Sequence, residues 1–281
     1  MAATVKKILV GVGRDPRSDI ALKYAGKLGM KLGAMVTAMH VVKQEPIPAS
    51  WPIKEQMERD LEDERQRITQ VITEIVKKET LSHVQFRRVT KGNPADHLIK
   101  KSEQEGYDLI VIGHRDLPNI KKLFLGSVSS KVVQYAEVSV LVAKEITGPS
   151  KVLFCIDGSK CAERALRFGG ELIQGLGCRA TVLNVTPWIT DESRSLAREI
   201  AEEGTEIIRG LGIDASSKAI FKKEIAKEIL GEAEKGNYDL IVVGSRGLSG
   251  IQKFLLGSTT LKLINQTSRP ILVYKRHHQN N

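Results

Sequence analysis

The sequence has few cysteines and no long apolar run. Its 281 residues include only Cys155, Cys161 and Cys178, an odd number at wide spacing, which fits neither a disulfide framework nor a zinc site. No stretch of about 18 uncharged apolar residues exists to form a transmembrane helix. The first residues lead into a strand-like segment without the apolar region of a signal peptide. We therefore expect a reduced, cytoplasmic protein with no membrane partner and no metal site.

Common catalytic signatures are also missing. The six histidines do not combine with carboxylates at the spacing of zinc ligands. The chain contains neither a Gly-x-Ser-x-Gly elbow nor a Walker-type Gly-Lys-Ser/Thr loop. No catalytic residue is therefore predicted.

Acidic residues are outnumbered, since 43 Lys and Arg face 33 Asp and Glu for a net charge of +10. The excess is spread over both halves of the chain, so it does not form a basic tail. Charge alone is compatible with nucleic acid, but this distribution favours solvated lysine faces. We do not expect a nucleic-acid partner. The electrostatic field of the net positive charge would, however, favour a site for a small polyanion.

An internal repeat is the main positive feature. The segment Tyr107–Gly113 reads YDLIVIG and Tyr238–Gly244 reads YDLIVVG. A Gly-Ser pair follows thirteen residues after each final glycine, and a short apolar segment ends each copy. The starts also match, because KILVGVG at Lys7–Gly13 corresponds to KVLFCID at Lys151–Asp157. The chain is therefore two copies of one module.

The repeat also sets the expected domain boundaries. The offset between the copies falls from 144 residues at their starts to 131 near their ends, so the first copy has about 13 extra residues. We place them in Pro46–Asp60, where Trp51 and the charged helix that follows form either a partner surface or a simple loop and exposed helix. Because Gly148-Pro149 marks a break, we expect domains at 1–146 and 150–277.

Apolar runs and helical periodicity alternate along each copy. In the first copy, strands are expected at Ile8–Val12, Met35–Val42, Val84–Val89, Leu109–Ile112 and Val138–Ala143, and helices from Ile20, at Glu55–Lys78 and at Ala95–Glu105. Alternation of this kind predicts an α/β fold with a five-stranded parallel sheet and helices on both faces. Ligands of such sheets bind at the carboxyl ends of the strands.

One loop of the second copy has the features of a phosphate site. It follows the strand that ends at Val243-Gly244, continues through Gly247 and reaches Gly257 before a helix expected at Thr259–Gln266. Glycines let the backbone approach a ligand closely, and helix N-termini favour anions. Hydroxyl and cationic side chains accompany the glycines, namely Ser258, Thr259, Thr260, Arg246 and Lys253. The alternative is a tight turn with Ser258 as a helix N-cap.

The spacing Gly, two residues, Gly, nine residues, Gly-Ser resembles the ATP-binding signature of the universal stress protein family. The closing segment, Arg269-Pro-Ile-Leu-Val-Tyr-Lys, is similar to that family's last strand, and the resemblance covers nearly the whole chain, once per half. It implies two tandem Rossmann-like domains of the adenine nucleotide alpha hydrolase-like type. It also implies an ATP-binding, cytoplasmic stress-response or regulatory protein with an unidentified protein partner. Magnesium would accompany the phosphates.

The family's nucleotide-binding positions can be transferred to the second copy. The resemblance implies that Asp157 holds the nucleoside beside Cys155 and Ile156, and that the backbone of Val185 contacts adenine. The remaining positions implied for ribose and phosphates, with their loop neighbours, are Val243, Gly244, Arg246, Gly247, Gly257, Ser258, Thr259 and Thr260. The alternative for Asp157 is a cap on the helix that starts near Cys161.

The first copy departs from the pattern at two positions. Gly13 stands where the second copy has Asp157, and Asp15 is wrongly spaced to replace it. Asp116 stands where the second copy has Gly247, and a carboxylate there would face phosphates of like charge. We expect the first copy to bind ATP weakly or not at all.

The last strand of each copy is expected to be an apolar edge, which invites pairing with another strand. In the family these strands pair across a two-fold dimer interface. Here they would pair within one chain as a pseudo-dimer, and a further homodimer stays open. Two other functional classes also stay open. One is a slow ATPase or nucleotidyl transferase, although no general base is visible near the phosphates. The other is an interaction protein without a ligand.

Overall fold

The computed structural model describes residues 5–13, 17–43, 54–114, 125–247 and 256–275. The first module contains β1 (Lys7–Val12), α1 (Arg17–Leu32), β2 (Met35–Lys43), α2 (Lys54–Lys78), β3 (Val84–Gly92), α3 (Pro94–Gln104), β4 (Leu109–Gly113), α4 (Ser127–Tyr135) and β5 (Ser139–Ala143). The second contains β6 (Lys151–Cys155), α5 (Lys160–Ile173), β7 (Arg179–Thr186), α6 (Asp191–Gly210), β8 (Asp214–Phe221), α7 (Ile225–Lys235), β9 (Leu240–Gly244), α8 (Ser258–Gln266) and β10 (Ile271–Tyr274). The predicted alternation is confirmed in both copies.

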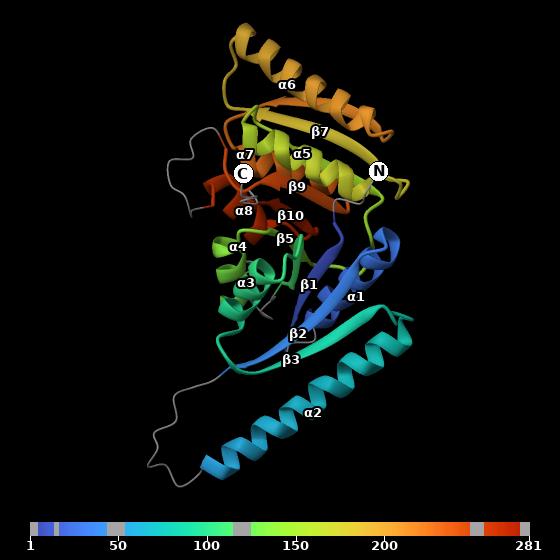
Figure 1. Cartoon of the computed structure of the whole chain (residues 1–281). Helices are drawn as coiled ribbons and strands as arrows, with labels where there is room; N and C mark the ends of the chain where they lie inside the picture. Colours follow the sequence, from blue (N-terminus) through green and yellow to red (C-terminus); the bar gives the residue numbers. More distant parts are fainter. Residues whose placement is uncertain (1–4, 14–16, 44–53, 115–124, 248–255, 276–281) are drawn as a thin grey trace.

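The strands form one ten-stranded sheet in the order β3-β2-β1-β4-β5-β10-β9-β6-β7-β8. Neighbours within each module are parallel, whereas β5 and β10 pair antiparallel through Val140 with Val273, Leu141 with Leu272 and Val142 with Ile271. The predicted pairing of the two last strands within one chain is therefore confirmed. Figure 1 shows the two modules stacked end to end across this junction.

Helices cover both faces of the sheet, and the apolar core of each face runs through both modules. One face buries side chains of α1, α2, α5 and α6, including Leu22, Ile72 and Ile208. The other buries side chains of α3, α4, α7 and α8, including Leu98 and Leu263. Strands covered on both faces read as continuous apolar runs, which is why these strands are rich in Val, Ile and Leu.

Two lysines extend the junction from the strands to the helices. Lys144, just after β5, donates through Nζ to the carbonyl oxygen of Ile264 at 2.9 Å and to that of Thr267, at the end of α8. Lys275, just after β10, donates through Nζ to the carbonyl oxygen of Gln134 in α4 at 3.3 Å. Each module thus places a cation at the carboxyl end of the other module's last helix, where the helix dipole is negative.

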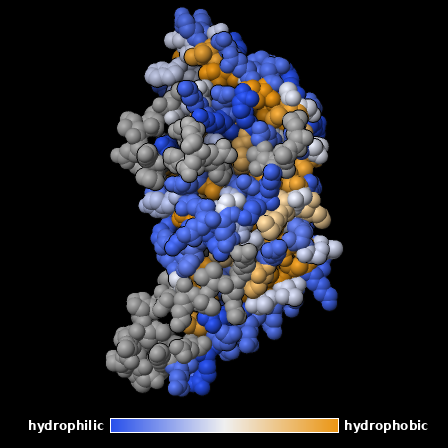
Figure 2. Space-filling model, in the orientation of Figure 1, coloured by the Kyte–Doolittle hydropathy of each residue, from blue (hydrophilic) through white to orange (hydrophobic). Residues whose placement is uncertain are grey.

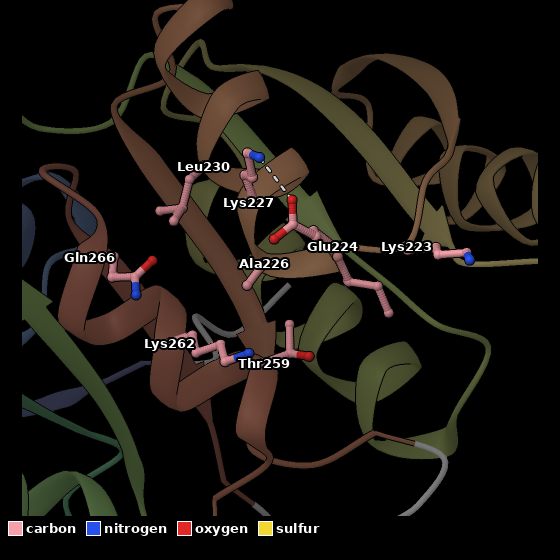
Figure 3. A pocket seen from close by; sticks show the side chains of 9 residues that line it. Lys223, Glu224, Ala226, Lys227, Leu230, Thr259, Lys262 and Gln266 are labelled. Atoms are coloured by element: carbon pink, nitrogen blue, oxygen red, sulfur yellow. Dashed lines mark hydrogen bonds and ion pairs between the residues drawn. The ribbon is translucent and has the colours of Figure 1, made fainter.

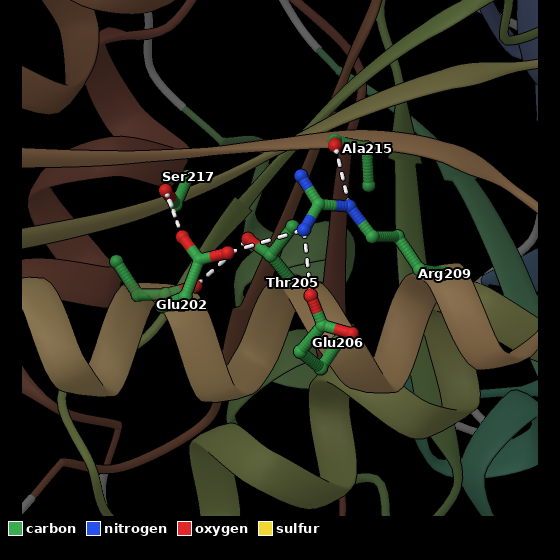
Figure 4. A network of polar contacts seen from close by, with 7 residues as sticks. Glu202, Thr205, Glu206, Arg209, Ala215 and Ser217 are labelled. Atoms are coloured by element: carbon green, nitrogen blue, oxygen red, sulfur yellow. Dashed lines mark hydrogen bonds and ion pairs between the residues drawn. The ribbon is translucent and has the colours of Figure 1, made fainter.

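A polar network covers the free edge of β8. Arg209 of α6 donates through Nε to the carbonyl oxygen of Ala215 at 3.1 Å and pairs with Glu206 at 2.6 Å (Figure 4). Glu202 accepts a hydrogen bond from Ser217 in the same strand. Charged side chains over an edge strand discourage pairing with another chain.

None of the helices in the described residues combines the length and the apolar character that crossing a membrane requires. Among the coloured residues of the face drawn in Figure 2, hydrophilic ones dominate. The segment 44–53, which contains Trp51 and much of the predicted insertion, lies outside the described residues. The remainder of that insertion belongs to α2, which has 25 residues whereas α6 has 20.

Candidate functional site at the carboxyl ends of β6 and β9

The residues after β6 are held against β7 by two hydrogen bonds. The backbone N–H of Ile156 donates to the carbonyl oxygen of Leu183 at 2.9 Å, and Nδ2 of Asn184 donates to the carbonyl oxygen of Ile156 at 3.0 Å. Val185, the predicted adenine contact, is buried at the carboxyl end of β7. These bonds fix the chain where it leaves the sheet and turns into Asp157.

Burial raises the pKa of the neighbouring Cys155 thiol. The thiol therefore stays protonated at neutral pH, and a protonated thiol is a poor nucleophile. Cys155 can therefore contribute its backbone groups and the packing of its side chain to this site, and not a reactive thiolate.

Asp157 begins a tight turn but does not cap α5. Its Oδ1 accepts the backbone N–H of Ser159 at 3.0 Å, and Gly158 has a φ of +80°, which favours glycine. The N-cap of α5 is Ser159, whose hydroxyl oxygen accepts the N–H of Ala162. The cap alternative for Asp157 is therefore wrong.

The second oxygen of Asp157 lies against Gly247 of the glycine loop. A β-carbon added to Gly247 would overlap Oδ2 of Asp157. The structure thus brings together two positions that are 90 residues apart in the sequence, one after β6 and one after β9. Only glycine fits at Gly247 while the Asp157 carboxylate stays in place.

Gly257 brings the end of the loop back to the carboxyl end of β9, close to Gly247. Its N–H donates to the carbonyl oxygen of Ser245 at 2.9 Å, and the N–H of Ser245 donates to the carbonyl oxygen of Tyr274 at 3.0 Å. A β-carbon on Gly257 would lie 3.8 Å from the backbone nitrogen of Gly247. The two ends of the loop therefore meet at the carboxyl end of β9, although residues 248–255, including Lys253, lie outside the described residues.

The start of α8 lacks a side-chain cap. Gly257 occupies its N-cap position and provides no side-chain hydrogen bond, and Ser258 is the first helical residue and is exposed. The alternative that Ser258 caps the helix is therefore wrong. The first N–H groups of a helix have no partner within the helix, and together with the helix dipole they attract anions.

Thr260 links α8 to β9. Its side chain is buried, and its hydroxyl donates to the carbonyl oxygen of Gly244 at 2.9 Å. In the first module Ser129 donates in the same way to the carbonyl oxygen of Gly113 at 2.9 Å. The hydroxyl proton of Thr260 is therefore used within the protein, whereas Ser258 and the partly exposed Thr259 keep their side chains toward the surface.

Positive charge gathers beside the loop. Arg246 is partly exposed in the turn after β9, and Lys275 is buried close to it. Desolvation by burial, followed by repulsion from Arg246, lowers the pKa of Lys275 to about 8. An anion at this end of the sheet would relieve the repulsion between the two groups.

The first module has a different arrangement at the matching point. Gly13 is exposed, and a β-carbon there would meet no atom within 4 Å. His40 takes the place of Asn184, with Nδ1 2.9 Å from the carbonyl oxygen of Val12. The second predicted departure, Asp116, and Asp15, the wrongly spaced substitute for the missing aspartate, lie outside the described residues. The contact of a carboxylate with a glycine backbone is therefore described in the second module alone.

Sequence reasoning missed the residues that hold the site together. Asn184, Ser245 and Tyr274 act through backbone groups that join different elements, and Ser159 caps α5 through the N–H of Ala162. Ser159 carried a usable signal, because a serine before a helical run is a common N-cap. The other three carried none, since their partners are set by the register of the sheet.

Fold and sequence together define a duplicated, doubly wound α/β protein with a glycine-containing loop after β9 in its second module. The model of the universal stress protein family matches residues 4–144 and again 149–275. The chain therefore belongs to the universal stress protein family, as a tandem member.

Individual relatives agree with this assignment. A universal stress protein of Mycolicibacterium smegmatis is 27% identical over 297 residues, which cover 98% of each chain. Universal stress protein YxiE of Bacillus subtilis is 28% identical over 149 residues, which span 45% of this chain and 99% of its own. The crystal structure of a universal stress protein from Archaeoglobus fulgidus shares the fold, with a TM-score of 0.76 and 24% identity over 99% of this chain and 100% of its own.

Proposed function

We propose that the second module binds an adenine nucleotide, ATP in the first instance, and that the protein acts as a nucleotide-responsive regulatory module. The observation that carries the proposal is the contact between the Asp157 carboxylate and the Gly247 backbone beside the start of α8. It joins a hydrogen-bond acceptor for a sugar hydroxyl to a set of N–H donors for phosphates.

Each group has a role in this proposal. Oδ2 of Asp157 accepts from the ribose, and the backbone near Val185 reads the adenine edge. The N–H groups at Ser258 and Thr259 and the charge of Arg246 hold the phosphates. No cluster of three or more metal-ligating side chains occurs in the described residues, so a magnesium ion would arrive bound to the phosphates.

The regulatory part of the proposal concerns the Gly247–Gly257 loop. Both ends of this loop reach the same point of the site, so an occupant there would interact with both. We expect ATP to slow hydrogen exchange across residues 245–260. Unchanged exchange with saturating ATP would exclude a nucleotide-driven change of this surface.

The first experiment is to denature the freshly purified protein and quantify the nucleotide released per chain by chromatography and mass spectrometry. About one adenine nucleotide per chain is expected, and Asp157→Ala should abolish it. If none is released, millimolar Mg-ATP should still raise the melting temperature. Absence of both effects would contradict the proposal and favour an interaction protein without a ligand.

The same protein distinguishes binding from catalysis. Sustained ATP turnover above the rate with magnesium alone, lost in both Asp157→Ala and Gly257→Val, would assign it to the enzymes that consume ATP. Bound nucleotide without such turnover is the expected result.

A further inference from the structure

A groove separates α7 and α8 in the second module. Its volume is about 440 Å³, and it is lined by Lys223, Glu224, Ile225, Ala226, Lys227, Leu230, Thr259, Lys262 and Gln266. Figure 3 shows Lys227 and Leu230 on α7 and Thr259, Lys262 and Gln266 on α8, with the Lys227 ammonium directed to Glu224.

An ion pair spans the matching seam of the first module. Nζ of Lys131 in α4 lies 2.7 Å from Oδ1 of Asp96 in α3. At the constant offset of 131 residues these positions become Lys262 and Lys227. Two lysines therefore stand at the positions that hold an attractive pair in the first module. The one carboxylate of the lining, Glu224, attracts both of them, because Lys227 and then Lys262 lower the pKa of its carboxyl.

The N-cap of α7 also differs from that of its counterpart α3. Asn93, the N-cap of α3, accepts the N–H groups of Ala95 at 3.0 Å and Asp96 at 3.3 Å. Glu224, the N-cap of α7, makes no side-chain cap hydrogen bond. Its carboxylate instead pairs with Lys227 at 2.8 Å.

The lining of the groove carries a surplus of positive charge. Three lysines face one carboxylate, and that carboxylate is already paired with Lys227. Within the part of the chain that the structure describes, neither Lys223 nor Lys262 takes part in an ion pair, and both are exposed. Exposed cations on two walls favour an anionic occupant.

Part of the lining is apolar. Ile225, Ala226 and Leu230 are only partly buried and line the groove together with the lysines. An inorganic anion would contact the lysines and leave these side chains in water. An occupant with both carboxylates and an apolar side chain would satisfy the lysines and the apolar lining together.

We propose that the groove between α7 and α8 binds an acidic peptide segment of a partner protein that carries apolar side chains among its carboxylates. The two helices provide the walls, as in other grooves that accept a peptide. The first module cannot bind in this way, because Asp96 and Lys131 neutralise each other there. The inference does not depend on nucleotide binding and is tested without nucleotide.

The test is a fluorescence-anisotropy titration of the full chain with a fluorescein-labelled peptide of alternating Glu and Leu. The variant Lys227→Asp places a carboxylate opposite Lys262, as in the first module, and should weaken binding by about tenfold or more. Lys100→Asp makes the same charge change on an exposed position of α3 and should have much less effect. Equal loss in both variants would overturn the proposal.

A second peptide of alternating Glu and Gly tests the apolar lining. It should bind more weakly than the Glu–Leu peptide to the wild-type chain, because it buries no apolar side chain. The Glu–Leu peptide should also slow hydrogen exchange at residues 225–230 and 259–266. Equal affinities of the two peptides would show that the surface attracts anions by charge alone and would overturn the proposal.

Discussion

The carboxylate of Asp157 occupies the space that a side chain at Gly247 would need. The two residues belong to different loops, and neither loop alone requires a glycine at that point. A substitution at Gly247 therefore acts by displacing Asp157.

Gly247→Ala should lower ATP affinity at least about tenfold, because the new methyl group displaces the nucleoside acceptor. Isothermal titration calorimetry measures the change. Gly231→Ala is the matched control, since a β-carbon on this residue of α7 meets no atom within 4 Å. The control should bind ATP normally and gain about 0.5–1 kcal/mol of stability from the better helix former. Normal affinity in Gly247→Ala would contradict the assigned role of Asp157.

Thr260→Val should reduce the free energy of unfolding by about 1–2 kcal/mol, because the buried carbonyl of Gly244 loses its hydroxyl donor. Thr260→Ser keeps the donor, as Ser129 does in the first module, and should retain most of the stability. Denaturant titrations of the two variants provide the comparison. A similar loss in both would indicate that packing of the Thr260 methyl group, and not the hydrogen bond, is what matters.

The first module should gain a nucleotide when its two departures are reversed. Gly13→Asp adds a carboxylate at an exposed position with free space around the β-carbon, and Asp116→Gly restores the glycine of the pattern. The double variant should raise bound nucleotide from about one to about two per chain, as measured by chromatography after denaturation. A stoichiometry that stays at one would mean that other residues, such as His40, prevent binding.

Lys275 should make stability depend on pH in the alkaline range. Its pKa is lowered from 10.5 to about 8 in the folded chain, so the unfolded chain binds the proton more tightly. The free energy of unfolding therefore decreases as the pH falls from about 10.5 to about 8, and this contribution is constant below that window.

The check is the difference in unfolding free energy between wild type and Lys275→Met, measured by denaturant titration at several pH values. This difference should change across the window of pH 8 to 10.5. Lys100→Met removes an exposed lysine, and its difference from wild type should stay nearly flat. A flat difference for Lys275→Met as well would mean that the buried ammonium is stabilised as well as it is in water.

The sequence was most informative where the two copies could be compared. The repeated YDLIV segments predicted the parallel sheets, because buried strands need a continuous apolar run. The pairing of β5 with β10 was predicted from the apolar edge of each copy together with the resemblance to the universal stress protein family. Caps were predicted less well. Asp157 and Ser258 each have the residue type of a cap, but the turn at Gly158 moves the cap of α5 to Ser159, and Gly257 takes that position in α8.

The remaining features depend on contacts that no local pattern encodes. The meeting of Asp157 and Gly247 is fixed by the register of β6 against β9. The hydrogen bonds of Lys144 and Lys275 to the last helix of the opposite module depend on how the modules pack. The replacement of Asp96 by Lys227 is visible in the aligned repeat, yet its significance requires the knowledge that α7 and α8 form a groove there.

The antiparallel joint between β5 and β10 has one more consequence. Assembly of the two halves is a unimolecular step, so dilution does not separate them. In a homodimer every substitution is present twice, once in each subunit. Joined in a single chain, the two halves can change separately. The first half has Gly13 where the second has Asp157, and the second has Lys227 where the first has Asp96.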